Sequence, residues 1–376
     1  MILERKSPDY LLFAVVIMLL SIGTCIIFSS SFIMAEKWYG DSYYFLKKQI
    51  VYVIIALAVL LFSMNIDYHF YKKISTPLLI LSVMLLAMVF IPGVGRSAGG
   101  ATRWINLEYF SFQPSEVAKF ALILYMAESM TRKDLREIKT FEKGILPSLI
   151  IIGIIFVLIL KEPDFSTALI ILGISFTMLF VGGTKIIQLF SLIAATIPLG
   201  ALILLREEYR KVRLLAFLNP WKDPLDSGFH VIQSLVALGS GGITGVGLAE
   251  SRQKFFYLPD QHTDFIFSII GEELGFFGTV LVIVLFSILL WRGYRIASQS
   301  TDDFGCLLAI GITFVIAFQS IINIGVVTKM LPTTGITLPF VSFGGTSLII
   351  NMLSIGVLLN ISRFKMKDDV KKNGSR

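Results

Sequence analysis

The stretch FIFSIIGEELGFFGTVLVIVLFSILLW occupies residues 265–291 and decides what kind of fold this chain adopts. Its second part, from Phe276 to Trp291, contains no charged residue. A helix over the whole stretch is roughly 40 Å long, whereas the hydrocarbon core of a bilayer is only about 30 Å thick. We therefore predict a membrane-spanning helix that either tilts or stands with its first turns in a cavity.

The rest of the chain has the composition of an integral membrane protein. Of its 376 residues, 55% are hydrophobic and 16% are charged, against about 25% charged in a typical soluble domain. Ten apolar runs approach the length that crosses a bilayer, which predicts an all-α fold in which residues 1–376 form a single polytopic membrane domain. The runs are residues 10–33, 47–64, 77–92, 114–130, 145–160, 166–183, 186–205, 265–291, 305–326 and 343–362.

Basic residues mark one side of the predicted bundle. The short connections on that side, together with the basic tail 363–376, carry more than half of the 33 Lys and Arg residues. The positive-inside rule then places both termini in the cytoplasm. The net charge of +7 is thus a topology signal, and we expect no nucleic-acid partner.

Three connections on the opposite, outer side are long or unusual, as functional loops tend to be. They are residues 92–113, the large loop 206–262 between the seventh and eighth runs, and residues 327–342. The large loop contains the glycine-rich stretch 239–247, which lacks the GxxxxGK[ST] pattern and a preceding strand, so nucleotide binding is excluded. Its apolar stretch 230–239 is predicted to fold back toward the membrane, and the broken segment 327–342 is predicted to line a site or passage.

Charged and aromatic side chains gather in the first outer segment and the helix after it. Pro114 suits the first helical position, which puts Glu116 in the first turn and Lys119 on the same face. Glu116 and Lys119 either form an ion pair that eases their desolvation or take part in a site. Arg96, Arg103 and Lys119 are candidates to hold an anionic headgroup such as a pyrophosphate. Trp104 is either an interfacial residue or a support for a sugar ring.

Four carboxylates cluster around the start of the 265–291 stretch. Asp264, or Thr263 beside it, is a natural cap for the helix; alternatively, Asp264 is a general base at the membrane surface. Asp260 and Asp264 are also placed to hold a divalent cation, Mg²⁺ or Mn²⁺, together with a substrate pyrophosphate. We expect Glu272 and Glu273 to pair with cations of neighbouring helices, because unpaired carboxylates are costly there.

Three further side chains near this cluster are candidate substrate-binding residues. Arg252 and Lys254 are cations available to an anionic substrate, and His262 stands between the two aspartates. The three histidines of the chain form no zinc-binding pattern, so no metal ligand is assigned.

Four stretches taken together resemble the SEDS family of FtsW, RodA and SpoVE proteins. They are RWI…QPSE..K, NPW.DPL.SGF..IQS, SRQKFFYLP…TDFIF…EELG and NIGVVT…P.TGI.LPF.S.GG.S. The resemblance covers essentially the whole chain, and the NPWKDPL and SRQKFFYLP stretches are closer to FtsW and SpoVE than to RodA. Asp260 departs from the family, in which glutamate is commoner at this position.

The resemblance implies ten transmembrane helices and a definite activity. It implies a peptidoglycan glycosyltransferase that polymerises lipid II at the outer face of the bacterial cytoplasmic membrane and releases undecaprenyl pyrophosphate. By the same resemblance, Asp264 is the essential aspartate, Trp104 the functional tryptophan of the first outer loop, and Glu116 and Lys119 the buried pair after the QPS motif. One carboxylate suffices for such a transfer, because the pyrophosphate needs little protonation to leave.

The resemblance also implies partners, and two other functions stay open. The family partner is a class B penicillin-binding protein, a transpeptidase, with other division or sporulation membrane proteins beside it. The alternatives are a lipid II flippase, favoured by buried charges such as Glu116 and Lys119, and a scaffold that only activates a penicillin-binding protein. The sequence does not distinguish roles in division, elongation or spore cortex formation.

Overall fold

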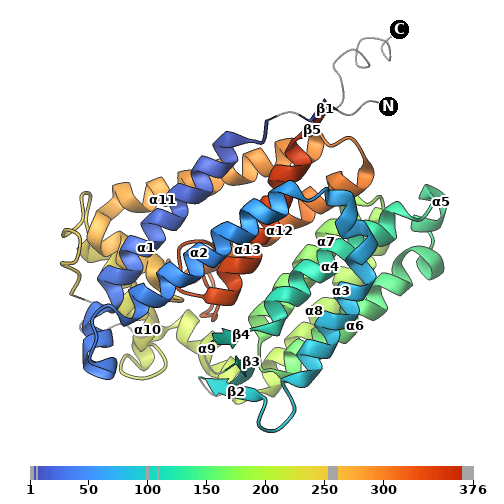
Figure 1. Ribbon diagram of the computed structural model, residues 1–376. Coiled ribbons are helices and arrows are strands. Elements are labelled where there is room, and N and C mark those ends of the chain that lie inside the picture. The colour runs from blue at the N-terminus through green and yellow to red at the C-terminus, as the bar shows by residue number, and fades with distance from the viewer. Residues whose placement is uncertain (1–3, 6, 99–100, 108–109, 253–260, 366–376) are drawn as a thin grey trace.

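The computed structural model describes residues 4–5, 7–98, 101–107, 110–252 and 261–365, which form a bundle of long helices (Figure 1). Within these ranges, eight helices are long and apolar enough to cross a membrane. Two more complete the ten predicted spans: α7 is apolar but has only 17 residues, and α4 has charged residues within its 18. The predicted all-α membrane fold is confirmed.

The spanning helices follow the order of the apolar runs. They are α1 (Tyr10–Tyr39), α2 (Tyr44–Asn65), α3 (Tyr68–Met88), α4 (Pro114–Thr131), α6 (Leu146–Lys161), α7 (Phe165–Val181), α8 (Ile186–Arg206), α11 (Ile266–Ser298), α12 (Asp303–Val327) and α13 (Gly345–Ser362). The shorter helices are α5 (Leu135–Ile138), α9 (Glu208–Leu218) and α10 (Phe229–Ser240). The stretch predicted to fold back forms α10, which packs against α11.

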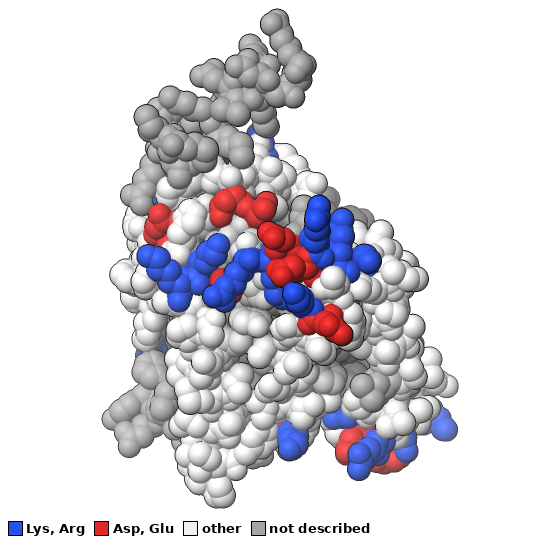
Figure 2. All heavy atoms as spheres, turned by 90° about the vertical axis from the view of Figure 1, so that its right-hand side faces the viewer, with Lys and Arg blue, Asp and Glu red and all other residues white. Residues whose placement is uncertain are grey.

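The last two spans lie in the interior of the bundle together with α4, most of whose residues are buried. In the most apolar window of each helix, 67% of α12 and 72% of α13 is buried, against 6% of α8. The outer helix α8 therefore exposes large apolar side chains such as Ile187 and Phe190. Figure 2 shows charged side chains in a broad band and in a smaller cluster at the lower edge, with an uncharged surface between them. Such a belt is the surface expected where lipid tails replace water.

The first outer segment forms a small antiparallel sheet that the sequence did not predict. Strands β2 (Gly95–Ala98), β3 (Ala101–Leu107) and β4 (Phe110–Phe112) pair in chain order. The sheet is fastened to α13 through Thr346, whose hydroxyl accepts from the Gln113 N–H at 3.3 Å and donates to the Ser111 carbonyl at 3.1 Å. In Figure 1 it lies below the helices, at the end opposite the terminal strands.

The helix that opened the sequence analysis is not continuous. At Gly275 the backbone of α11 leaves helical geometry, with φ 65° and ψ −158°. The glycine-rich stretch 241–247 fills the break: the N–H groups of Val246 and Gly247 donate to the carbonyls of Glu272 and Glu273 at 3.0 and 3.1 Å. Phe276 and Phe277 in turn donate to the carbonyls of residues 242 and 243. The stretch that looked like a phosphate loop therefore satisfies the backbone groups that the break exposes.

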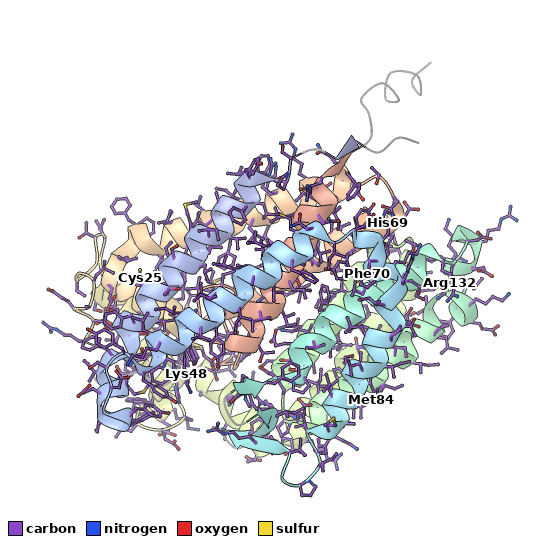
Figure 3. All side chains as sticks on the ribbon, viewed as in Figure 1. Cys25, Lys48, His69, Phe70, Met84 and Arg132 are labelled. Atoms are coloured by element: carbon purple, nitrogen blue, oxygen red, sulfur yellow. The ribbon has the colours of Figure 1, made fainter. Side chains whose placement is uncertain are left out.

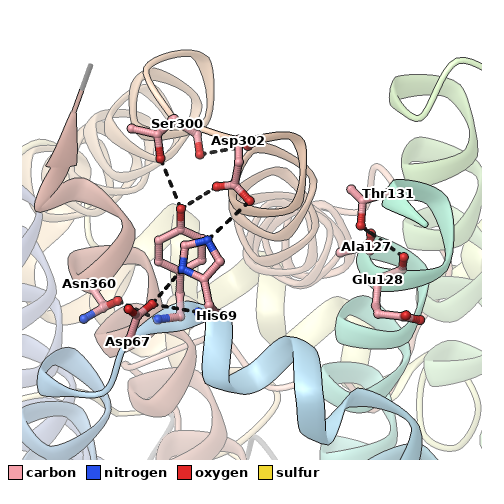
Figure 4. A network of polar contacts seen from close by, with 10 residues as sticks. Asp67, His69, Ala127, Glu128, Thr131, Ser300, Asp302 and Asn360 are labelled. Carbon is pink, nitrogen blue, oxygen red and sulfur yellow. Dashed lines mark hydrogen bonds and ion pairs between the residues drawn. The ribbon is translucent and has the colours of Figure 1, made fainter. Parts of the chain in front are cut away.

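A polar network joins α3 to the start of α12 and to α13 (Figure 4). The Tyr68 N–H donates to Asn360 Oδ1 at 2.9 Å, and the Tyr68 hydroxyl donates to Asp302. His69 lies between Asp67 and Asp302, with ring nitrogens 2.8 and 3.7 Å from their carboxylates. Nearby, the strands β1 (Glu4–Arg5) and β5 (Phe364–Lys365) pair, so both ends of the described chain lie on one side, as an even number of spans requires. Most of the predicted tail 363–376 lies outside the described residues.

Replacing Gly245 with alanine is expected to destabilise the protein. Gly245 has φ +83°, and a Cβ there would lie 2.1 Å from the Glu273 carbonyl oxygen. The strain and the displaced loop should cost on the order of 2 kcal/mol or more. Gly153→Ala is the matched control, because nothing lies within 4 Å of a Cβ at that helical position. Thermal unfolding in detergent measures both, and equal melting temperatures would contradict the role of the loop.

Candidate active site

A cavity of about 550 Å³ opens at the end of the bundle that carries the sheet. Its walls come from α2, α4, β3, the turn before α11 and the broken segment between α12 and α13. Seven of the predicted site residues line it: Arg96, Arg103, Trp104, Glu116, Lys119, His262 and Asp264. The broken segment lines this cavity, since Gly335, Ile336 and Thr337 form part of the wall, and its predicted role in a functional site stays a prediction.

Asp264 lies in a turn that α12 and the broken segment hold in place. The Asn323 side chain donates to the Asp264 carbonyl at 2.8 Å and to the Ile336 carbonyl at 2.7 Å. The Ser342 hydroxyl donates to the Thr263 carbonyl at 2.6 Å. The predicted cap position is displaced by one residue: α11 begins at Ile266 and its cap position is Phe265, not Asp264 or Thr263. The half-buried Asp264 side chain instead faces the cavity.

Arg103 and Asp264 face the same point of the cavity wall. A Cβ built on Gly335 would lie 3.6 Å from Asp264 Oδ2 and 3.8 Å from Arg103 Nη1. Because residue 335 is a glycine, no side chain of its own fills the space beside the carboxylate and the guanidinium. A carboxylate and a cation thereby lie near one point of the wall, the two kinds of group that transfer from a phosphorylated donor uses.

The connection between α6 and α7 orients Arg103. Its guanidinium donates to the carbonyls of Glu162, at 3.2 Å, and Pro163. The Glu162 carboxyl is fully buried, and burial, reinforced by the nearby Asp164 charge and opposed by Arg103, raises its pKa to about 8. A largely protonated Glu162 does not neutralise Arg103 at pH 7, so the guanidinium charge remains available to an anion.

Glu116 and Lys119 form a buried ion pair within α4. Lys119 Nζ lies 2.8 Å from Glu116 Oε1, and both side chains are more than 90% buried. Of the two interpretations of these residues, the ion pair is confirmed. Both side chains also line the cavity, so a role toward a ligand stays a prediction.

The cavity contains further groups that the sequence analysis did not single out. Lys48 and Tyr52 of α2 and Gln319 of α12 line it, and Lys48 Nζ donates to the Tyr44 hydroxyl at 2.7 Å. Figure 3 shows Lys48 near the sheet end of α2, far from His69 and Arg132 at the other end. The signal that could have identified Lys48 is a lysine near the start of the apolar run 47–64. The His262 ring packs on Phe45, with centroids 4.6 Å apart.

Several predicted residues lie elsewhere. Arg252 is exposed and does not line the cavity; its backbone N–H donates to Glu272 Oε1 at 2.8 Å. Ser251 also donates to Glu272, and Ser29 donates to Glu273. The expected cation partner of Glu272 is thus replaced by a hydroxyl and a backbone N–H, because the loop that fills the α11 break passes beside it. Lys254 and Asp260 lie outside the described residues.

The predicted divalent-cation site stays a prediction. Among the residues that the structure describes, no group of three or more His, Cys, Asp or Glu side chains is arranged to hold a metal. Asp264 offers carboxylate oxygens to the cavity, which suit Mg²⁺ or Mn²⁺. Its predicted second donor, Asp260, is outside the described ranges.

Comparison with known proteins identifies the family. A family model described as "Cell cycle protein", built on FtsW, RodA and SpoVE, matches residues 9–367. The chain belongs to this family. The predicted resemblance to FtsW, RodA and SpoVE is therefore confirmed over nearly the whole sequence.

Named relatives of this SEDS protein point to cell-wall synthesis. It is 42% identical over 359 residues to a probable peptidoglycan glycosyltransferase FtsW of Geobacter metallireducens, with 96% of each chain covered. It is 44% identical to the stage V sporulation protein E of Bacillus subtilis, over 96% of this chain and 98% of that one.

Solved structures of relatives share its architecture. A chain from a study of how a peptidoglycan synthase complex coordinates polymerization and crosslinking has a TM-score of 0.78 at 29% identity, with 95% and 98% of the two chains covered. The rod shape determining protein RodA of Thermus thermophilus has a TM-score of 0.69 at 26% identity, covering 96% of this chain and 98% of that chain.

Removing one partner of the α4 ion pair is expected to destabilise the protein. Lys119→Met leaves a buried carboxylate without its cation, which should cost about 3–5 kcal/mol. The double variant Glu116→Gln/Lys119→Met removes both charges and should regain most of the melting temperature. Thermal unfolding in detergent measures this recovery. A single variant as stable as the wild type would show that the pair is not a structural requirement.

Glu162→Gln should flatten the dependence of stability on pH. The pKa of Glu162 is raised from 4.5 to about 8 in the folded protein, so its contribution is fully present below pH 4.5. That contribution is lost as the pH rises from about 4.5 to 8, because only the unfolded state then gains from ionisation. Melting temperatures at pH 6 and pH 9 should differ less for Glu162→Gln than for the wild type. An equal difference in both proteins would contradict the raised pKa.

Proposed function

We propose that this protein polymerises lipid II into glycan strands at the outer face of the bacterial cytoplasmic membrane. It is a peptidoglycan glycosyltransferase, the activity named for its FtsW relatives. The observation that carries the proposal is the cavity wall on which Asp264 and Arg103 flank Gly335. A base and an unneutralised cation in one cavity suit a donor that leaves as a pyrophosphate.

In the proposed reaction Asp264 acts on the acceptor sugar. Its carboxylate takes the proton of the 4-hydroxyl as that oxygen attacks the anomeric carbon of the lipid-linked donor. The bond between that carbon and the pyrophosphate oxygen breaks, and undecaprenyl pyrophosphate leaves with the electron pair. Arg103 stabilises the charge that develops on the leaving group, and Lys119, which is paired with Glu116, offers N–H donors to the same cavity. Trp104 offers an aromatic face to a sugar ring.

The proposal includes the orientation of the protein in the membrane and its protein partners. The basic connections and both termini are cytoplasmic, so the sheet and the cavity face outward, where the sugars of lipid II are reached. A class B penicillin-binding protein crosslinks the strands, in keeping with the solved relative from a complex that couples polymerization and crosslinking. Other division or sporulation membrane proteins join this assembly. A divalent cation shared by Asp264 and the pyrophosphate would assist departure of the leaving group.

Asp264→Asn is expected to abolish glycan synthesis. A lost general base typically costs about 100-fold or more in rate. The assay gives labelled lipid II to the purified protein with its penicillin-binding partner in detergent and separates the glycan chains. Asp226→Asn, the same substitution at an exposed outer position, is the control and should keep wild-type activity.

The outcomes of this assay separate the alternatives. No glycan chains from the wild type, with lipid II translocated in sealed vesicles even by Asp264→Asn, would establish the flippase. No chains and no translocation, with activation of the transpeptidase, would establish the scaffold. Chains made equally well by Asp264→Asn would remove Asp264 from the mechanism.

A further inference from the structure

A second cavity, of about 320 Å³, adjoins the one that contains Asp264. Arg103 and Gly335 line both cavities. The second cavity lies between the start of α7, the helix α9 of the large outer loop, and residues 331–335. The proposed reaction does not use its remaining lining residues, although Arg103 and Gly335 connect it directly to the reacting centre.

The walls of this second cavity are mostly hydrocarbon. Phe165 and Leu169 come from α7, Leu214 from α9, Ile322 from α12, and Leu331 from the broken segment. A water-filled groove of this composition would be unfavourable beside a membrane surface, because burying apolar area is worth about 25 cal/mol per Å². An apolar ligand is therefore the chemistry that these walls fit.

The rim of the same cavity is positive. Arg210 lies over the Phe165 ring, 5.3 Å from its centroid, and Arg213 lies 5.7 Å from the Tyr209 ring centroid. Across the described part of the chain, neither of them nor Arg103 forms an ion pair with a carboxylate. Uncompensated guanidinium groups beside an apolar pocket match a ligand that has both a phosphate and a hydrocarbon chain.

The helix α9 also presents apolar side chains to the surroundings. Val212, Leu215 and Leu218 are 39%, 62% and 66% exposed, while Arg210 and Leu214 face the cavity. A short helix with apolar residues outward at the outer end of the bundle is suited to lie in the interface between lipid and water. A chain in the second cavity can thus pass beneath α9 into the bilayer.

We propose that this second cavity holds the first isoprene units of the lipid-linked donor, with its pyrophosphate at the junction formed by Arg103. The proposal rests on the proposed polymerase function and names the subsite for the donor's prenyl chain. Seating the chain here fixes the pyrophosphate beside Gly335 and brings the anomeric carbon toward Asp264. The arginines of α9 hold the pyrophosphate before transfer and the released prenyl pyrophosphate after it.

A matched pair of substitutions tests the subsite by kinetics. Leu169→Trp fills the cavity, whereas Leu215→Trp places the same side chain on the outer face of α9, away from the lining. We expect Leu169→Trp to raise KM about tenfold for lipid II with its full prenyl chain, since contacts of only a few methylene groups are worth that much. KM for a lipid II analogue with a short prenyl chain should change much less. Leu215→Trp should behave as the wild type with both donors.

Three kinetic results would contradict the expected outcome. An unchanged KM for the long-chain donor in Leu169→Trp would overturn the proposal. Equal losses with both donors would also overturn it, because the variant would then act on something other than the chain. A wild-type protein that makes no glycan at all would instead contradict the polymerase function.

Photocrosslinking of the wild-type protein tests occupancy without any variant. The probe is a prenyl pyrophosphate with a diazirine in its first isoprene units, added to protein in vesicles. We expect crosslinks in residues 165–169 and 331–335, competed by unlabelled prenyl pyrophosphate. Crosslinks at these residues from a phospholipid with a diazirine on its acyl chain, uncompeted by the prenyl compound, would assign the cavity to ordinary membrane lipid and overturn the proposal.

Discussion

The need to satisfy backbone groups inside an apolar medium is the constraint on which the site depends. Where α11 breaks at Gly275, backbone carbonyls and N–H groups lose their helical hydrogen bonds. A bilayer offers them no water as a substitute partner. The glycine-rich stretch 241–247 supplies those bonds from the large outer loop, and only glycine allows the backbones to approach so closely at Gly245. The break thus attaches the outer loop to the helix whose first turn follows Asp264.

Buried ionisable groups among the described residues of the bundle are accommodated in different ways. Lys119 balances Glu116 within one helix, and Glu162 avoids ionisation because of its burial. Arg103 differs from both, since it is held by backbone carbonyls and keeps its positive charge. A cation fixed in this way, without a carboxylate of its own, attracts an anionic substrate into a region that would otherwise repel charge.

The features that could be predicted from the sequence are those that depend on the length of apolar runs and on the types of residue. The ten spans, the cavity-lining role of residues 335–337 and the convergence of Arg103, Trp104, Glu116, Lys119, His262 and Asp264 could be anticipated from patterns and resemblance. The sheet β2–β4 could not, because its strands are short and lack clear alternation. The hydroxyl partner of Glu272 is Ser251, which follows the docked glycine-rich stretch, so it depends on a contact between distant segments. The position of Lys48 on the cavity wall depends on contacts between segments that are distant in the sequence. The second cavity depends on such contacts as well.

The intrahelical position of the Glu116–Lys119 pair bears on how the protein is made. The helices that bury α4 include α12 and α13, which are synthesised last. If the partner of a charge on α4 lay on α12 or α13, that charge would be unpaired when α4 is inserted into the lipid. Because its partner lies three residues along the same helix, α4 can be inserted as a nearly neutral segment at the moment of synthesis. The charges that later face the cavity are therefore carried into the membrane together, before the cavity exists.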